Sequence, residues 1–196
     1  MIEPRVWVGC ISCYNGGHLV GSWFDAEDAP EEMNGDYGWS RVIRKAPHNV
    51  PLPVSHFKES HEELWVFGFE GFHGLLTSEC SPSEAKKLAE VLDSIDSDRV
   101  DAFRAYVSDH LGPSYASEDW DGAVSQFEDA YAGEWDSGAD YAQELAEDLS
   151  GASSEQFSEW PYSCIDWERA WRDLEMGGDY SSSSTGRGTV YVFRSA

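Results

Sequence analysis

Residues 81–92 read Ser-Pro-Ser-Glu-Ala-Lys-Lys-Leu-Ala-Glu-Val-Leu, and this stretch marks the change from predicted strands to predicted helices. Three signals start a helix here: Ser81 is a good N-cap, Pro82 suits the first helical position, and Glu84 completes a capping box. The apolar residues that follow recur at helical spacing and predict a buried stripe. They are Ala85, Leu88, Ala89 and Leu92.

The segments before this helix have the composition of strands. Residues 4–13 are rich in β-forming residues, a Gly-rich turn follows, and residues 18–25 are predicted to return as a second strand of an antiparallel hairpin. Residues 64–69 are predicted to add a third strand to this small sheet. The Pro-rich residues 26–60 are expected to be irregular, with a short helix near residues 40–45.

The segments after it carry further helix signals. Helices are predicted over residues 98–111, which Gly112 and Pro113 would end, and over residues 118–131. Two more are predicted to begin at the N-caps Ser137 and Asp166. The apolar faces of these four helices are, in order, Val100, Phe103 and Val107; Trp120, Val124, Phe127 and Tyr131; Tyr141, Ala142, Leu145, Ala146 and Leu149; and Trp167, Ala170, Trp171 and Leu174.

The C-terminal end returns to a mixed character. Residues 180–188 are predicted to be a Ser/Gly-rich loop, and residues 189–193 a final strand. Strands, then helices, then a mixed end are typical of an α+β fold rather than a doubly wound sheet. We therefore expect a small antiparallel sheet in the N-terminal part, a helical middle and a mixed helix/strand C-terminal part.

The charge of the chain is its most unusual bulk property. Among 196 residues, 37 acidic side chains oppose 13 basic ones, which gives a formal net charge of −24. Solubility alone requires a net charge with a magnitude of only about 2 to 8 in a small domain. Aromatic residues make up 14% of the chain, so it does not resemble a disordered acidic tail. The charge predicts a basic partner and excludes direct binding of nucleic acid, while adaptation to high salt is an alternative explanation.

The acids concentrate in one stretch. No Lys or Arg occurs from Ala105 to Glu168, which holds sixteen acids. Asp140, Glu144 and Glu147 recur at helical spacing and would form one acidic face. Duplex DNA carries one charge per about 1.7 Å of axis, so acidic helices could offer a partner carboxylates in place of phosphates. The alternative is an ordinary solvated surface. The predicted partner-binding residues are Asp109, Glu118, Asp119, Asp121, Glu128, Asp129, Glu134, Asp136, Asp140, Glu144, Glu147 and Asp148.

Enzymatic and metal-binding alternatives find weaker support. Paired carboxylates with many Trp residues suit a glycoside hydrolase, but several of the Trp residues have helical core spacing and no acid pair stands out. Cys10 and Cys13 have the spacing of half a zinc site or a redox motif, yet the predicted strand places them on opposite faces or near the turn. We interpret them as buried or incidental cysteines, and expect no catalytic residue, metal or cofactor.

Targeting signals are also lacking. The sequence shows no signal peptide and no apolar run of membrane-spanning length. Four cysteines are few for a disulfide framework, so we expect a cytoplasmic protein with reduced thiols and no membrane contact.

Several blocks, spread in order along most of the chain, carry a family resemblance. They are Arg5–Cys10, Tyr14–Gly17, Gly21–Ala26, Glu70–Phe72, Phe127–Ser137, Asp140–Ala142, Ile165–Glu168, Arg172–Leu174 and Val190–Phe193. Together they resemble the ArdA antirestriction family, and the block over residues 127–137 is the most specific. Residues 28–62 look longer and richer in Pro than that family implies, and residues 181–188 look like an insertion.

The resemblance implies an elongated three-domain α+β protein that mimics bent B-form DNA, inhibits type I restriction–modification enzymes, is carried by mobile genetic elements and has no catalytic site. We accordingly expect a β-rich domain over residues 1–76, a helical domain over 77–113 and an acidic α+β domain over 114–196. The implied partner is the DNA-binding groove of the type I enzyme, and the implied assembly is a homodimer. A mimic or chaperone for another basic DNA-binding protein is the alternative. Three aromatic residues would pack either the C-terminal core or the dimer contact: Phe127, Tyr131 and Trp135.

Overall fold

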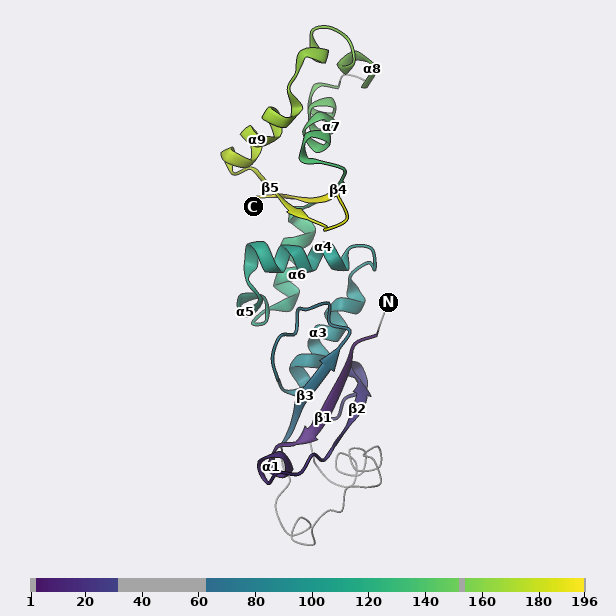
Figure 1. Cartoon of the computed structure of the whole chain (residues 1–196), viewed down its shortest axis with the longest axis vertical. Coiled ribbons are helices and arrows are strands. Elements are labelled where there is room, and N and C mark those ends of the chain that lie inside the picture. Colours follow the sequence, from purple (N-terminus) through teal and green to yellow (C-terminus); the bar gives the residue numbers. More distant parts are fainter. Residues whose placement is uncertain (1–2, 32–62, 152–153, 196) are drawn as a thin grey trace. The chain divides into compact units, whose positions relative to one another are not determined.

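The structure is a computed structural model that describes residues 3–31, 63–151 and 154–195. The chain forms two compact units, residues 1–100 and residues 101–196. The first unit has N-terminal strands followed by a helix, and the second combines helices with C-terminal strands (Figure 1). The predicted α+β class is therefore confirmed, whereas the division into three domains stays a prediction. Within the described ranges, no helix is both long and apolar enough to cross a bilayer.

The first unit is built on a three-stranded antiparallel sheet, which we call sheet A. Its strands are β1 (Arg5–Cys10), β2 (Gly21–Asp25) and β3 (Leu64–Glu70), in the order β2-β1-β3. Alternation along β1 buries Val6 and Val8, as expected of a sheet with one covered face. All three predicted strands are present, although β1 and β2 are shorter than the predicted residues 4–13 and 18–25. The predicted helix near residues 40–45 lies outside the described residues.

The predicted strand over residues 4–13 is wrong at its C-terminal end. β1 stops at Cys10, and helix α1 (Ile11–Asn15) begins at the next residue. Cys10 and Cys13 therefore do not alternate along a strand: Cys10 caps the helix and Cys13 lies within it. The reason is that strand pairing with β2 and β3 ends here, and α1 makes the connection that returns the chain to β2.

Helix α3 (Pro82–Ser94) covers sheet A and starts as predicted. The Ser81 side chain accepts a hydrogen bond from Glu84 N–H at 3.2 Å, and Ser81 N–H donates to the Glu84 carboxylate at 2.8 Å. Hydrogen bonds from the Ser81 side chain and backbone lower the pKa of Glu84. All four residues of the predicted stripe are buried, so local capping and packing specify the same helix.

The second unit contains most of the helices. They are α4 (Val100–Tyr106), the π-helical turn η3 (Val107–Leu111), α5 (Pro113–Ala116), α6 (Trp120–Ala130), α7 (Gly138–Ser150), α8 (Ser154–Phe157), the 3-10 turn η4 (Tyr162–Cys164) and α9 (Trp167–Gly177). The four predicted helices correspond to α4 with η3, α6, α7 and α9. Both predicted N-caps hold: Ser137 accepts from Asp140 N–H, and Asp166 accepts from Arg169 N–H.

The second sheet, sheet B, corrects two predictions. Its strands are β4 (Tyr131–Trp135), β5 (Tyr180–Ser184) and β6 (Val190–Arg194), in the antiparallel order β4-β6-β5. The predicted final strand is β6. Residues 180–184 are not a loop, because β6 supplies a strand partner that offsets the weak β-propensity of Ser. The predicted helix over 118–131 ends at Ala130, and Tyr131 instead begins β4.

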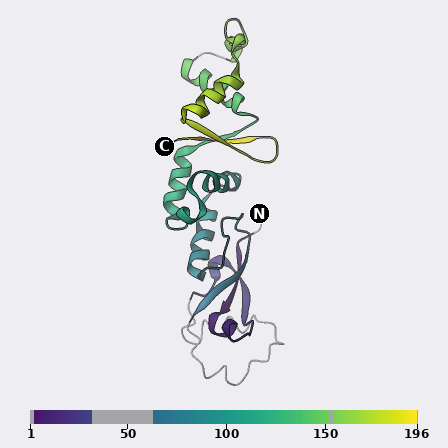
Figure 2. The ribbon, with the colours of Figure 1, turned by 60° about the vertical axis from the view of Figure 1, so that its left-hand side comes forward.

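Sheet B lies between two helical layers, with α4 and α6 on one side and α7 and α9 on the other (Figures 1 and 2). Strand β6 serves both layers because successive side chains point to opposite faces. Phe193 meets Phe127 at a ring-centroid separation of 6.5 Å, whereas Val192 packs in a cluster with Tyr141 and Trp171. The predicted apolar face of α7 is shorter than expected, since Leu149 is 81% exposed near the end of the helix.

Candidate functional site

The second unit is where the charge imbalance is greatest. Residues 101–196 contain 20 acidic side chains against five Arg and no Lys. Of the twelve acids predicted to bind the partner, eleven are exposed and Glu147 is partly buried. We call these twelve residues the acidic surface.

Helix α6 presents several members of the acidic surface opposite its buried side. Asp119 is its N-cap and accepts a hydrogen bond from Gly122 N–H at 3.0 Å. Glu118 lies in the turn before the helix rather than on it, which corrects the predicted helix start. The remaining acids lie near the two ends of the helix. They are Asp121 in the first turn and Glu128 and Asp129 in the last.

Helix α7 presents the acidic face that the spacing predicted. Asp140 accepts a hydrogen bond from the Ser137 hydroxyl at 2.5 Å, so it stabilises the first turn as well as carrying charge. Glu144 and Asp148 are exposed. Glu147 accepts from the Gln143 amide at 3.0 Å. The buried Tyr141 holds this helix against Trp171 of α9 at a ring-centroid separation of 5.9 Å, so the acids stand on a packed element.

Two predicted acids hold the β5–β6 hairpin in place. Asp109 of η3 accepts a hydrogen bond from the Ser183 hydroxyl at 2.5 Å. Glu134 of β4 accepts one from the Thr189 hydroxyl and lies 3.5 Å from Arg187 in the hairpin loop. Hydrogen bonds and an ion pair within the fold therefore use part of the bonding capacity of these two carboxylates. They therefore have a structural role in addition to the charge that they present.

Acids also occupy helix positions that stability alone disfavours. In each of α3, α6, α7 and α9 the last turn contains an acidic residue and no basic one. The carbonyl groups at a helix C-terminus carry partial negative charge, which makes a nearby carboxylate unfavourable by about 0.3–1 kcal/mol. Four helices therefore end with a charge that the helix dipole disfavours, although Glu175 of α9 accepts a hydrogen bond from the Ser182 hydroxyl at 2.8 Å.

The three aromatic residues singled out from the sequence all contact other residues of the second unit. Phe127 is fully buried and lies 5.4 Å from Phe103, centroid to centroid. Tyr131 stacks on Phe127 at 5.1 Å. Trp135 meets Tyr141 at 5.3 Å and donates its indole N–H to the Ala132 carbonyl at 3.0 Å. These contacts form the aromatic core beneath the acidic surface.

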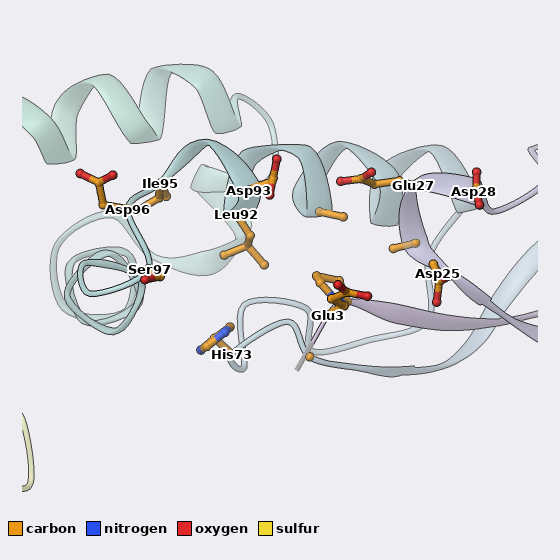
Figure 3. A pocket seen from close by; sticks show the side chains of 14 residues that line it. Glu3, Asp25, Glu27, Asp28, His73, Leu92, Asp93, Ile95, Asp96 and Ser97 are labelled. Atoms are coloured by element: carbon orange, nitrogen blue, oxygen red, sulfur yellow. The ribbon is translucent and has the colours of Figure 1, made fainter. Parts of the chain in front are cut away.

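Sequence reasoning missed a second acidic region, which lies in the first unit. A cavity of about 770 Å³ opens beside the end of α3, and no Lys or Arg occurs among its lining residues (Figure 3). Its acids come from segments up to about 90 positions apart, so no local pattern could have grouped them. They are Glu3, Asp25, Glu27, Asp28, Asp93 and Asp96.

Carboxylates are the chemical groups that the acidic surface presents. The described residues include no group of three or more His, Cys, Asp and Glu side chains placed to hold a metal ion. Burial lowers the pKa of His110, which stacks on Tyr106 at a centroid separation of 5.1 Å, although the neighbouring Asp109 opposes that shift. His110 itself is exposed and packs at the edge of the aromatic core, with its ring 5.2 Å from the Phe193 ring, centroid to centroid.

A family model for antirestriction protein (ArdA) matches residues 6–189 of the sequence. The matched range begins in β1 and ends in the loop between β5 and β6, so it includes the whole acidic surface. No curated protein matches the sequence.

Proposed function

The chain belongs to the ArdA family of antirestriction proteins, and from this premise we propose that it is a DNA mimic that inhibits type I restriction–modification enzymes. It would bind in the groove through which such an enzyme holds DNA, and it would exclude the duplex by competition. The family is one of inhibitors rather than enzymes, and the proposed mechanism needs no reaction at the surface of the protein.

The observation that carries this proposal is the acidic surface on the packed core of the second unit. Seven of its twelve charges lie on α6 and α7, whose opposite faces are buried, and this limits how far those carboxylates can move apart. Acids at the unfavourable ends of α6 and α7 add to the argument, because selection for stability would replace them. A requirement for negative charge at these positions accounts for their presence.

The physical basis of inhibition is exchange of one polyanion for another. The Lys and Arg side chains of a DNA-binding groove would pair with carboxylates where they otherwise pair with phosphates. Residues four apart on α7, such as Glu144 and Asp148, are separated by about 6 Å along the helix axis, since each residue rises about 1.5 Å. Complementary charge would also steer the encounter, so association should be fast and should slow as salt is added.

The proposed binding is distributed over many groups. Single neutralisations should matter little and several together should accumulate, because exposed ion pairs contribute only about 0.2–1 kcal/mol each. We further propose that the working form is a homodimer, as the resemblance to the family implies. Sedimentation velocity would test the dimer directly, and a monomer at the concentrations that inhibit would rule it out.

A competition experiment tests the proposed function. A purified type I methyltransferase core is bound to a labelled target duplex, and the protein is titrated in at two salt concentrations. Displacement near stoichiometric ratios that weakens with salt is the expected result. If the folded protein displaces no duplex, the proposal fails. A mimic or chaperone for another basic DNA-binding protein would then be the next hypothesis, tested by pull-down of basic proteins.

Matched variants separate the acidic surface from net charge. The surface variant neutralises four exposed acids of the second unit, and the control variant neutralises four exposed acids of the first unit. The surface variant carries Glu118→Gln, Asp136→Asn, Glu144→Gln and Asp148→Asn. The control variant carries Glu63→Gln, Glu79→Gln, Glu90→Gln and Asp98→Asn. Displacement by the surface variant should weaken about tenfold or more, because the small free-energy contributions of four exposed ion pairs add up. Equal weakening in both variants would show that only net charge matters.

A further inference from the structure

Two thiols meet where sheet A passes into its first helix. Cys10 is the last residue of β1 and the N-cap of α1, and Cys13 lies one helical turn later. The backbone N–H of Cys13 donates to the sulfur of Cys10 at 3.5 Å. Both residues are reduced thiols, and both are buried, with exposures of 1% and 0%. Figure 1 shows α1 at the end of β1.

This arrangement has the geometry that a disulfide needs. Residues three apart on a helical turn have Cα atoms about 5 Å apart, inside the range of roughly 4.4–6.8 Å that a disulfide spans. An N-cap side chain folds over the first turn toward the third helical residue, and the contact between Cys13 N–H and the Cys10 sulfur shows that it does so here. Joining the two sulfurs therefore asks for side-chain rotation rather than a rearrangement of the sheet.

Other interpretations of the pair fit less well. A structural zinc site uses four ligands, and the described residues provide no group of three or more ligating side chains. The pair also differs from the other two cysteines. Burial raises the pKa of Cys80 to about 11, and its backbone forms a bridge with Val66, whereas Cys164 is exposed. Only Cys10 and Cys13 have sulfur and backbone already in contact across one turn.

We propose that Cys10 and Cys13 form a reversible intramolecular disulfide, so that the junction of β1 and α1 is a redox modification site. With oxidised glutathione as the oxidant, one cysteine thiolate attacks the glutathione disulfide and releases one reduced glutathione. The second cysteine thiolate then displaces the other glutathione and closes the S–S bond. The two thiols lose two electrons and two protons, and one oxidised glutathione becomes two reduced ones.

The burial of both thiols sets the rate of this reaction rather than its endpoint. The first attack requires α1 to open, and α1 has only five residues, of which Tyr14 and Asn15 are exposed. It is followed by Gly16 and by Gly17 at a φ of 79°. Short elements at a glycine-rich connection belong to the part of a fold that opens at low free energy. Oxidation should therefore be slow in the native protein but should reach the same equilibrium as in refolding protein.

Equilibration of the full-length protein in glutathione buffers of increasing oxidised fraction tests the proposal. One series starts from folded reduced protein and a second from protein refolding out of denaturant, so that a shared endpoint excludes a kinetic barrier. Samples are quenched with acid, alkylated under denaturing conditions and digested with trypsin. The peptide over residues 6–41 contains both cysteines and no other, while Cys80 and Cys164 fall in the peptides 59–86 and 105–169.

The expected result is a peptide 6–41 that lacks the mass of two hydrogen atoms, takes up no alkyl group and returns to the alkylated form after reduction. Cys80→Ser should leave this closure unchanged, and Cys13→Ser should abolish it and leave a glutathione adduct at Cys10. A peptide that stays alkylated, or carries only glutathione adducts, after both series have converged would overturn the proposal.

Discussion

Helix α7 carries an acid at each end, and neutralising the two separately should change stability in opposite directions. Asp140 lies in the first turn and accepts a hydrogen bond from the Ser137 hydroxyl. Asp148 lies in the last turn, is exposed, and follows Glu144 by four residues. The variants Asp140→Asn and Asp148→Asn each remove one negative charge from the same helix. Their effects on partner binding should therefore be alike, although their effects on folding differ.

The magnitudes follow from the position of each carboxylate. At the N-terminus, Asp140→Asn loses a favourable interaction with the helix dipole of about 0.3–1 kcal/mol and weakens a charge-assisted hydrogen bond. At the C-terminus, Asp148→Asn removes an unfavourable dipole interaction of about 0.3–1 kcal/mol. Glu144 lies four residues from each acid, so both variants also lose a like-charge repulsion of about 0.2–0.5 kcal/mol, which cancels in their difference. The two variants should thus differ by about 1–2 kcal/mol, with Asp148→Asn the more stable. That difference corresponds to several degrees in Tm, at about 4–8 °C per kcal/mol for a domain of 60–100 residues.

Thermal and urea unfolding measure the stability of both variants, and duplex displacement from the methyltransferase core measures their binding. We expect Tm to fall for Asp140→Asn and to rise for Asp148→Asn, while displacement weakens by less than about fivefold in each. Stability changes of the same sign would refute the dipole argument. Complete loss of displacement by a folded Asp140→Asn protein would indicate a discrete site and refute the distributed surface.

Three further predictions concern the second unit. Gly138→Ala should destabilise the protein by about 1–3 kcal/mol in urea unfolding, because the added Cβ would lie 2.3 Å from the Trp171 ring; a neutral effect would contradict this packing. Because burial lowers the pKa of His110, the unfolded state takes up its proton first, so stability should fall as the pH drops below about 6.5. His110→Phe should reduce that loss in unfolding measured at several pH values, and parallel pH profiles would refute the assignment. Arg187→Gln releases Glu134 from a pair at 3.5 Å and adds net negative charge, so duplex displacement should be equal or stronger; weaker displacement would contradict a charge-driven contact.

The helix starts could be predicted from the sequence because their determinants are local. A cap and its partner lie three residues apart, as Ser81 and Glu84 do, and so do Ser137 and Asp140. The exposure of most predicted acids could be predicted as well, because helical spacing places them on the faces opposite the apolar residues. Local sequence signals therefore sufficed to predict the helices and the positions of most of the exposed acids.

The strands of sheet B were harder to predict because their determinants are distant in sequence. The serines of β5 form a strand because residues 190–194 pair with them. A run of serines contains no local signal that predicts this pairing. Tyr131 has the helical spacing of α6, yet pairing with Phe193 draws it into β4. The structural role of Asp109 was hidden for the same reason, since its partner Ser183 lies 74 positions away.

The end of α7 and the turn after β1 show a third limit. Leu149 has the spacing of a core residue, but among the residues that the structure describes it is left 81% exposed. Residues 11–13 have the composition of a strand, but they fold as a helix once strand pairing stops. In both cases the sequence pattern continues past the point where its packing partner ends.

The acidic ends of the helices make ionic strength act on this protein in two opposing ways. Added salt screens the repulsion among neighbouring carboxylates within a Debye length of about 10 Å at 0.1 M, which favours the folded state. In the proposed complex, the same screening would weaken the attraction of a basic groove for those carboxylates. The protein should therefore fold most securely under the conditions in which it competes least well for its partner. Changing the ionic strength alone should therefore change stability and potency in opposite directions.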